Sequence, residues 1–431
     1  MALRRPVSTP RRAPASSLAA AKEPWQLQPL SRQLRAPLGT HPPSPQTALG
    51  RLQAVRPAEY ARTRNHLDGA VTGLSPYITH GMLPFAQVIH TLRDRHGLGL
   101  RHKLIQELAW RAYFRHRWRH DGERIFGSLH AGPLPDSAYA SLLPSDVLEG
   151  RTGVPAIDQA VRVLYTTGTL HNHARLWLAS YLIHVRKVHW RIGADWMWAH
   201  LLDGDLASNH LSWQWVAGTA SAKPYLFNAE NVSRFAPAPW HSPATAIDAT
   251  YTELEHLARA AQALKAEPGA HPGVLPPPVR SVPPQDFEFS APDAAAIVDR
   301  EIWLMHPWSL ARPPDGALCI AFIDLEFHTR WPWSVHRWAW VLAHMGERAQ
   351  LRWAGSTQAC VQALGRARAI HGPSDPHLPH PIGAMLSSPA PAFAEPVERC
   401  RSFSHWWQQV NDFGAAVPPS APLQAHSPPL R

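Results

Sequence analysis

Residues 203–215 read Asp-Gly-Asp-Leu-Ala-Ser-Asn-His-Leu-Ser-Trp-Gln-Trp, and this stretch decides the interpretation of the chain. Its polar and aromatic members are Asp203, Asp205, Asn209, Trp213 and Trp215. Two carboxylates, an amide and two indoles so close together make a poor solvent-facing surface and an unusual core. A purely structural explanation is a helix capped by Asp205 or Ser208, with both tryptophans buried. The surrounding sequence has to decide between that explanation and a binding site.

Three more segments carry polar side chains in patterns that suit a ligand. Residues 72–76 read Thr-Gly-Leu-Ser-Pro, which predicts a helix with Ser75 as N-cap and a start that can bind phosphate. Residues 107–111 read Glu-Leu-Ala-Trp-Arg, which places an acid and an indole on one helical face. Residues 168–175 begin a helix with polar and basic side chains where apolar ones are expected. Taken singly, each segment could equally be an ordinary capped or solvent-facing helix.

The rhythm of apolar residues divides the chain into a helical part and an α/β part. Three- and four-residue spacing predicts helices over 84–95, 101–119, 158–166, 172–189, 194–202 and 251–265. Short apolar runs predict strands at 301–305, 318–325 and 350–353, alternating with helices at 338–345 and 358–369. The expected fold class is therefore multidomain, with an all-helical domain followed by a smaller Rossmann-like α/β domain with a parallel sheet.

The 431 residues suffice for two or three domains. The predicted units are a disordered basic Pro-rich arm (1–50), a helical domain (51–265), a Pro-rich linker (266–298), an α/β domain (299–415) and a disordered tail (416–431). The linker follows from Pro-Pro-Pro and Pro-Pro runs, which neither a helix nor a central strand can continue.

Charge and cysteine content restrict the function classes. The net charge of +10 is concentrated early: residues 1–50 carry 7 Lys/Arg and 1 Asp/Glu, residues 51–240 carry 21 and 14, and residues 241–431 carry 14 and 17. This distribution is compatible with an anionic partner such as nucleic acid, although a basic balance alone is common among proteins that bind none. Three widely spaced cysteines argue against a disulfide scaffold and a structural zinc site, and suit a cytoplasmic protein. No apolar run is long enough to span a membrane, and we expect a monomer without metal.

Taken together and in order, these segments resemble the flavin-binding helical domain of the DNA photolyase/cryptochrome family over about residues 54–237. The strongest part is residues 153–215, where Gly-x-Pro-x-Ile-Asp, His-Asn-x-x-Arg, Asp-Gly-Asp-Leu-Ala-x-Asn and Trp-Gln-Trp follow one another. The resemblance implies a U-shaped FAD as cofactor. It also implies light-driven electron transfer to a flipped-out pyrimidine dimer.

The resemblance assigns cofactor-binding positions to Thr72, Gly73, Leu74, Ser75, Asn172, Arg175, Asp203, Asp205 and Asn209. Within this set it implies that the loop 72–75 holds the diphosphate, that Arg175 pairs with Asp203, and that Asn209 faces flavin N5. Photolyases of the family carry Asn at that last position, whereas plant cryptochromes carry Asp. Asn209 therefore favours repair.

The resemblance assigns substrate contacts to Glu107, Trp110, Arg111 and Trp215. Aromatic faces would replace the stacking that a flipped base loses, and the Glu107 carboxylate would bond to the pyrimidine. Members that repair (6-4) lesions carry two histidines where this chain has Asn172 and Leu176, so cyclobutane dimers are the expected substrate. Catalytic roles would fall to Asn209, Glu107, Trp213 and Trp190.

Two departures from the family pattern leave alternatives open. Trp213 and Trp190 match the first two members of the family's tryptophan chain, but a third is missing, so Tyr139 or Tyr165 would substitute or the chain is broken. The α/β domain follows the helical domain, whereas the family's antenna domain precedes it. We expect a relocated antenna-like domain of unknown chromophore, the alternative being an unrelated accessory domain. A cryptochrome-like light sensor and a degenerate flavoprotein scaffold are the competing functions.

Overall fold

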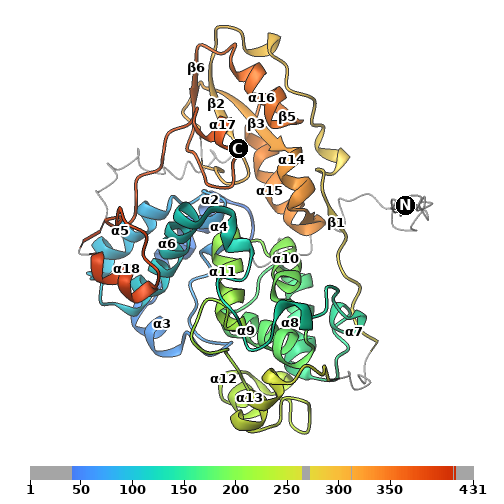
Figure 1. Ribbon diagram of the computed structural model, residues 1–431. Helices are drawn as coiled ribbons and strands as arrows, with labels where there is room; N and C mark the ends of the chain where they lie inside the picture. The colour runs from blue at the N-terminus through green and yellow to red at the C-terminus, as the bar shows by residue number, and fades with distance from the viewer. Residues whose placement is uncertain (1–40, 265–271, 312, 411, 414–431) are drawn as a thin grey trace, which may run out of the picture.

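The computed structural model describes residues 41–264, 272–311, 313–410 and 412–413. Helices dominate its first part. They are α2 (Pro45–Gln53), α3 (Pro57–Thr63), α4 (Ser75–Thr79), α5 (Phe85–His96), α6 (Lys103–Asp121), α7 (Ser145–Leu148), α8 (Pro155–Thr167), α9 (Asn172–Ser180), α10 (Trp190–His200), α11 (Leu206–Ala217), α12 (Ala229–Phe235) and α13 (Tyr251–Arg259). Figure 1 shows them as the lower part of the molecule, with α9, α10 and α11 side by side.

Local sequence explains where the central helices begin and end. The side chain of Asp205 accepts the backbone N–H of Ser208 at 2.9 Å and caps α11, which ends at the left-handed Gly218. The helix predicted over 172–189 is shorter than expected. Helix α9 is followed by a π turn at Tyr181–Val185, and the helical segment ends there. It cannot continue to residue 189, because Lys187 adopts a positive φ of 53° that no right-handed helix can contain.

The second part is the predicted α/β fold. Its parallel sheet has the order β5-β3-β2-β6, formed by β2 (Glu301–Met305), β3 (Leu318–Asp324), β5 (Leu351–Gly355) and β6 (Ala369–His371). Helices α14 (Leu325–Arg330), α15 (Val335–Arg348) and α16 (Thr357–Leu364) connect the strands. The fold class is confirmed, but the sequence missed β6 because it is only three residues long.

Other boundaries differ from expectation. Helix α2 begins at Pro45, within the arm predicted to be disordered, where Ser44 caps it. Residues 1–40 and the predicted tail 416–431 lie outside the described part of the chain. The predicted linker contains β1 (Val279–Arg280), which pairs with β4 (Trp333–Ser334). Helix α13 ends at Arg259 rather than 265.

The two parts share a hydrophobic core. One buried cluster joins α5 and α6 to the parallel sheet, and a second fills the space among α8, α9 and α10. The predicted domain boundaries stay predictions, yet the first core runs across the boundary placed after residue 265. The helical part and the C-terminal lobe (residues 299–372) are therefore packed against each other.

After the lobe, the chain returns to the helical part. This C-terminal strap (residues 373–410) includes α17 (His380–Gly383) and α18 (Phe403–Gln409), and Figure 1 shows α18 beside α6. Glu395 bonds to His116 and Arg119, and Arg399 pairs with Asp121. The strap thus contacts the C-terminal part of α6, whereas its helix α17 packs against α16 of the lobe. Among the described helices, none has the length and apolarity that crossing a membrane requires.

Candidate functional site

Of the residues quoted at the outset, 203–205 form a buried turn after α10, and 206–215 belong to α11. Arg175, in the first turns of α9, reaches Asp203 with Nη2 at 2.8 and 2.9 Å from the two carboxylate oxygens. Burial alone would raise the pKa of Asp203, but Arg175 and a hydrogen bond from Ser75 hold it below its ordinary value. The expected pairing of Arg175 with Asp203 is confirmed, and Ser75 joins it.

Asp205, two residues after Asp203, is fully buried and forms ion pairs with two arginines. Its Oδ2 accepts from Arg111 at 3.2 Å and from Arg115 at 2.9 and 3.1 Å, while Oδ1 caps α11. Burial opposes ionisation, but the two guanidiniums hold the pKa of Asp205 well below its ordinary value. Arg111, predicted to contact substrate, therefore bonds to Asp205 and to Thr79.

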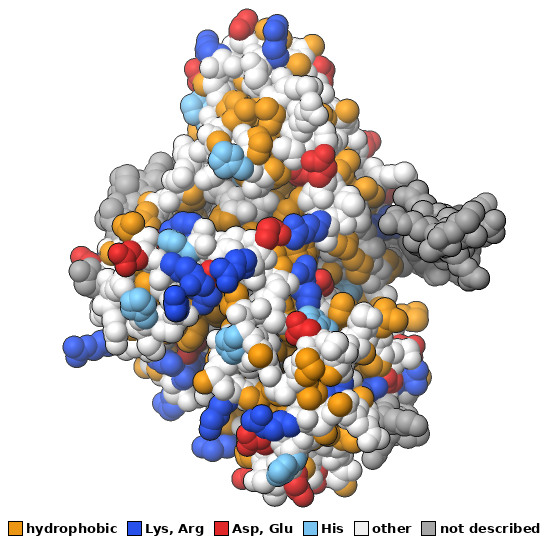
Figure 2. Space-filling view, viewed as in Figure 1, with side chains coloured by type: hydrophobic (Ala, Val, Ile, Leu, Met, Phe, Trp, Pro, Cys, Tyr) orange, Lys and Arg blue, Asp and Glu red, His pale blue; other side chains and the backbone are white. Residues whose placement is uncertain are grey.

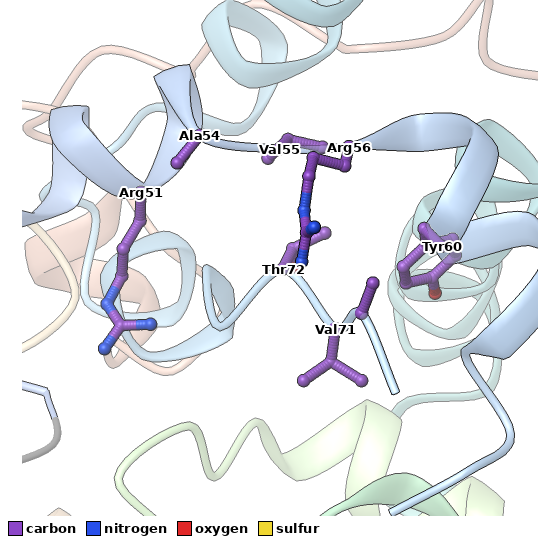
Figure 3. Close-up of a pocket in the computed structure, with 8 residues that line it drawn as sticks. Arg51, Ala54, Val55, Arg56, Tyr60, Val71 and Thr72 are labelled. Atoms are coloured by element: carbon purple, nitrogen blue, oxygen red, sulfur yellow. The ribbon is translucent and has the colours of Figure 1, made fainter. Parts of the chain in front are cut away.

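The loop 72–75 precedes α4, and the reason given for a phosphate site there has to be corrected. Ser75 is the first residue of the helix and not its cap, since its hydroxyl bonds to Asp203. With only five residues, α4 offers little helix dipole. The loop instead borders a cavity of about 150 Å³ whose lining includes Arg51, Arg56, Tyr60 and Thr72. Figure 3 shows Arg51 and Tyr60 at opposite sides, with Arg56 and Thr72 between them in this view.

Gly73 is what allows Arg51 to approach this loop. A Cβ at Gly73 would lie 2.6 Å from Nη1 of Arg51, and the residue has a φ of 62°. Any other side chain would displace the guanidinium and strain the backbone. Leu74 is buried beneath the loop, whereas Asn172 is exposed at the start of α9. Of the predicted cofactor positions, Ser75 and Asn172 are the two that are exposed.

Asn209 and Trp213 lie on α11, facing α10. The amide nitrogen of Asn209 donates to the carbonyl of Ala194 at 2.9 Å, which orients the amide so that its oxygen is the acceptor left for a ligand. The indole of Trp213 lies against Gly193, where an added Cβ would come within 2.4 Å of the ring. A residue without a side chain at position 193 is therefore needed for this packing.

The two tyrosines weighed as substitutes for the missing tryptophan occupy different places. Trp190 donates to Ser128 at 2.9 Å and has the His189 ring 5.7 Å away, centroid to centroid. The Tyr139 ring lies 6.2 Å beyond His189. Tyr165 instead bonds to Trp196 and contacts His200. The geometry favours Tyr139 as the neighbour of Trp190.

The predicted substrate residues each have protein partners. Glu107 accepts from Lys103 at 3.1 Å and from Arg64 at 3.3 Å. Trp110 is stacked on Phe403 of α18, with ring centroids 4.0 Å apart and planes at 11°. Trp215 is 40% exposed and packs against Tyr225. Lys and Arg side chains gather over α6 on the face shown in Figure 2. The aromatic residues are thus at the surface, but one face of Trp110 is covered.

Several functional candidates escaped the sequence analysis. They are Arg51, Arg56, Tyr60, Arg115, Arg337, Asp375 and His377. Arg115 could have been found, because it lies one helical turn after Arg111. The last three could not, since they are far away in sequence and no pattern links them to the turn at 203–205.

Comparison with known proteins agrees with this geometry. Residues 104–238 match the family described as the FAD binding domain of DNA photolyase. A deoxyribodipyrimidine photo-lyase from Streptomyces griseus is 36% identical over 177 residues, covering 38% of this chain and 36% of that protein. Cryptochrome-1 of Arabidopsis thaliana is 28% identical over 238 residues, covering 46% of this chain and 34% of that protein. The chain spans about a third of the length of these relatives.

Among solved structures, the cryptochrome of Synechocystis sp. PCC6803 aligns with a TM-score of 0.40 and 27% identity, covering 44% of this chain and 43% of that one.

The residues present fit a flavin dinucleotide. The cavity beside Thr72 has room for phosphate groups, and two arginines line it. Gly73 keeps its place in the loop free of a side chain, and the Ser208 hydroxyl next to Asn209 is buried without a partner among the described residues. Donors of this kind suit an anionic, hydrogen-bonding ligand. Residues 104–238 of the helical part, which include the turn at 203–205, match the FAD binding domain of DNA photolyase.

Proposed function

We propose that the chain is a light-driven DNA repair protein that acts on cyclobutane pyrimidine dimers. The observation that carries the proposal is the contact of Ser75, Arg175 and Asp203. It brings three segments that the family uses for its cofactor into one place. Several relatives are named deoxyribodipyrimidine photo-lyase, which supports the same reaction class.

The proposed cofactor roles follow from the side-chain chemistry. Arg51 and Arg56 offer guanidiniums to the diphosphate at the loop 72–75. The Arg175–Asp203 pair presents a buried, ionised carboxylate to the flavin region. The Asn209 oxygen accepts a hydrogen bond without bringing a proton of its own, which suits a reduced flavin. When bound, the flavin supplies the light-driven electron, and these residues orient it.

The proposed substrate roles rest on exposure and charge. A dimer flipped from DNA loses its stacking, and aromatic side chains replace about 1–3 kcal/mol of it per base. Trp215 is available, and Glu107 can exchange its ion pairs for bonds to the pyrimidine. Basic side chains over α6 suit the phosphate backbone.

One observation favours the second candidate, a light sensor that binds FAD without repairing DNA. Phe403 occupies a face of Trp110, so a base cannot stack there while α18 stays in place. Tyr139 beside His189 and Trp190 supplies a path of aromatic residues that either function could use.

The two functions are separated by a repair assay. A single-stranded oligonucleotide with one thymine dimer is incubated with FAD-loaded, reduced protein, and dimer loss is followed by chromatography under blue light and in the dark. Repair predicts light-dependent loss that Glu107→Gln slows and that the control Glu255→Gln, which breaks another helical ion pair, leaves unchanged. A flavin-loaded protein that leaves the dimer intact would refute repair and favour sensing.

A further inference from the structure

The turn at 203–206 is held by hydrogen bonds from the C-terminal lobe as well as from the helical part. Arg337 of α15 donates Nη2 to the carbonyl of Gly204 at 2.7 Å and Nη1 to the carbonyl of Trp198 at 2.8 Å. These bonds hold the turn from the side of the lobe. The matched FAD-binding domain ends at residue 238, so Arg337 lies about a hundred positions beyond it.

The surroundings of Arg337 hold its side chain in this position. The side chain is fully buried, with its guanidinium carbon 4.6 Å from the ring centroid of Trp198 and 4.2 Å from that of Trp333. A Cβ at Gly204 would lie 2.5 Å from Nη1, so the glycine of Asp-Gly-Asp makes room for it. Burial lowers the pKa of Arg337 to about 9, which still leaves a cation at neutral pH.

The strap adds a second fastening at the other end of the turn. Nε2 of His377 accepts the backbone N–H of Leu206 at 3.2 Å, and Nδ1 lies 2.6 Å from Asp375. Burial lowers the pKa of His377 more than Asp375 raises it, so the imidazole is neutral and donates from Nδ1. Asp375 also accepts from Arg115 at 2.9 Å, the same arginine that holds Asp205.

The charges around the turn do not cancel. The carboxylates are Asp203, Asp205 and Asp375, and the guanidiniums are Arg111, Arg115, Arg175 and Arg337. One positive charge is therefore in excess. Within the part of the chain that the structure describes, Arg337 forms no ion pair and bonds to backbone carbonyls, so it supplies the excess charge. A surplus cation in a buried site favours an anionic ligand and its more negative redox state.

We propose that Arg337 is a positioning residue of the flavin site, supplied by the C-terminal lobe. It fixes the carbonyl of Gly204, and thereby the directions of Asp203 and Asp205, and it contributes the positive charge that favours the reduced, anionic flavin. His377 and Asp375 complete the fastening at Leu206. The part that concerns flavin rests on the proposed function, whereas the fastening of the turn does not.

The test compares Arg337→Met and Arg337→Lys with Arg352→Met, in the full chain. Arg352 serves as the control, because this half-buried arginine also donates to two backbone carbonyls away from the turn, those of Phe287 and of Gly346. Far-UV circular dichroism establishes that each variant is folded. Hydrogen–deuterium exchange of the flavin-free proteins reports on residues 203–209, and FAD titration and the midpoint potential report on the cofactor.

We expect Arg337→Met to raise amide exchange at 203–209 at least tenfold, to weaken FAD binding at least tenfold and to shift the potential to more negative values. Arg337→Lys keeps the charge and should restore the potential more fully than the exchange protection. Arg352→Met should match wild type in all three. Unchanged exchange at 203–209 in Arg337→Met, or an equal effect of Arg352→Met, would overturn the inference. Failure of wild type to take up FAD would refute the proposed function, while the exchange result would still decide the fastening.

Discussion

Replacing Arg175 by Met removes the partner of a buried carboxylate, and the structure allows the cost to be worked out. Nη2 of Arg175 makes two bonds to Asp203, whose side chain is 6% exposed. Breaking a buried pair from one side costs about 3–5 kcal/mol. Arg175 is 27% exposed, so solvent reduces this cost, and we expect the free energy of unfolding to fall by about 2–3 kcal/mol. Asp203→Asn keeps the shape of the partner and removes its charge.

A double-mutant cycle isolates the pair. Arg175→Met also loses the bond from Nε to the carbonyl of Leu170, but that loss occurs in the single and the double variant and cancels. Urea unfolding is followed by tryptophan fluorescence and by circular dichroism. If the two transitions coincide, unfolding is two-state and the free energies of unfolding can be compared. We expect a coupling energy of about 1–3 kcal/mol between Arg175 and Asp203. A coupling energy below about 0.3 kcal/mol would refute the reasoning, because independent sites behave that way.

Three further predictions follow from the site and the core. Asn209→Asp places a carboxylate where the amide oxygen now lies, which should destabilise the reduced flavin relative to the oxidised form by about 1.4 kcal/mol or more. The midpoint potential of the flavin should therefore become more negative. An unchanged potential would exclude a contact between residue 209 and the flavin. Trp110→Ala should weaken binding of dimer-containing DNA, measured by fluorescence anisotropy, by about 1–3 kcal/mol. Phe403→Ala should strengthen this binding, because it uncovers the indole of Trp110. Equal affinities of wild type and both variants would place the substrate elsewhere. Burial lowers the pKa of His184 and His306 to about 4, so below pH 6.5 the unfolded chain binds more protons than the folded one. The free energy of unfolding should therefore decrease from pH 6.5 toward pH 4, by up to about 1.4 kcal/mol per pH unit for each histidine. A melting temperature that does not change over this range would contradict the burial of these rings.

Local patterns predicted the fold class because the determining signals are local. Alternating strands and helices after residue 299 gave the parallel sheet, and the apolar spacing of 101–119 anticipated α6 closely. Boundaries failed where tertiary structure decides them. Nothing in the sequence before Lys187 announces its left-handed conformation, and the helical start at Pro45 lies in a stretch whose composition resembles a disordered arm.

The candidate site was partly predictable for the same reason. Asp203, Arg175 and Ser75 belong to motifs that can be recognised one by one, and the structure brings them together. Arg337 and His377 could not be anticipated, because their contacts depend on how the lobe packs against the helical part. Phe403 likewise reaches Trp110 only through the return of the strap along α6. The antenna-like character of the lobe stays a prediction.

The account depends on a flavin held beside the Asp203–Asp205 turn. The most direct test is an equilibrium titration of flavin-free protein with FAD, followed by flavin absorption and fluorescence, with Arg175→Met measured alongside. We predict saturation at one FAD per chain, with structured absorption bands, and at least tenfold weaker binding in the variant. A wild-type protein that shows no saturable uptake, or a variant that binds FAD as tightly as wild type, would contradict the account.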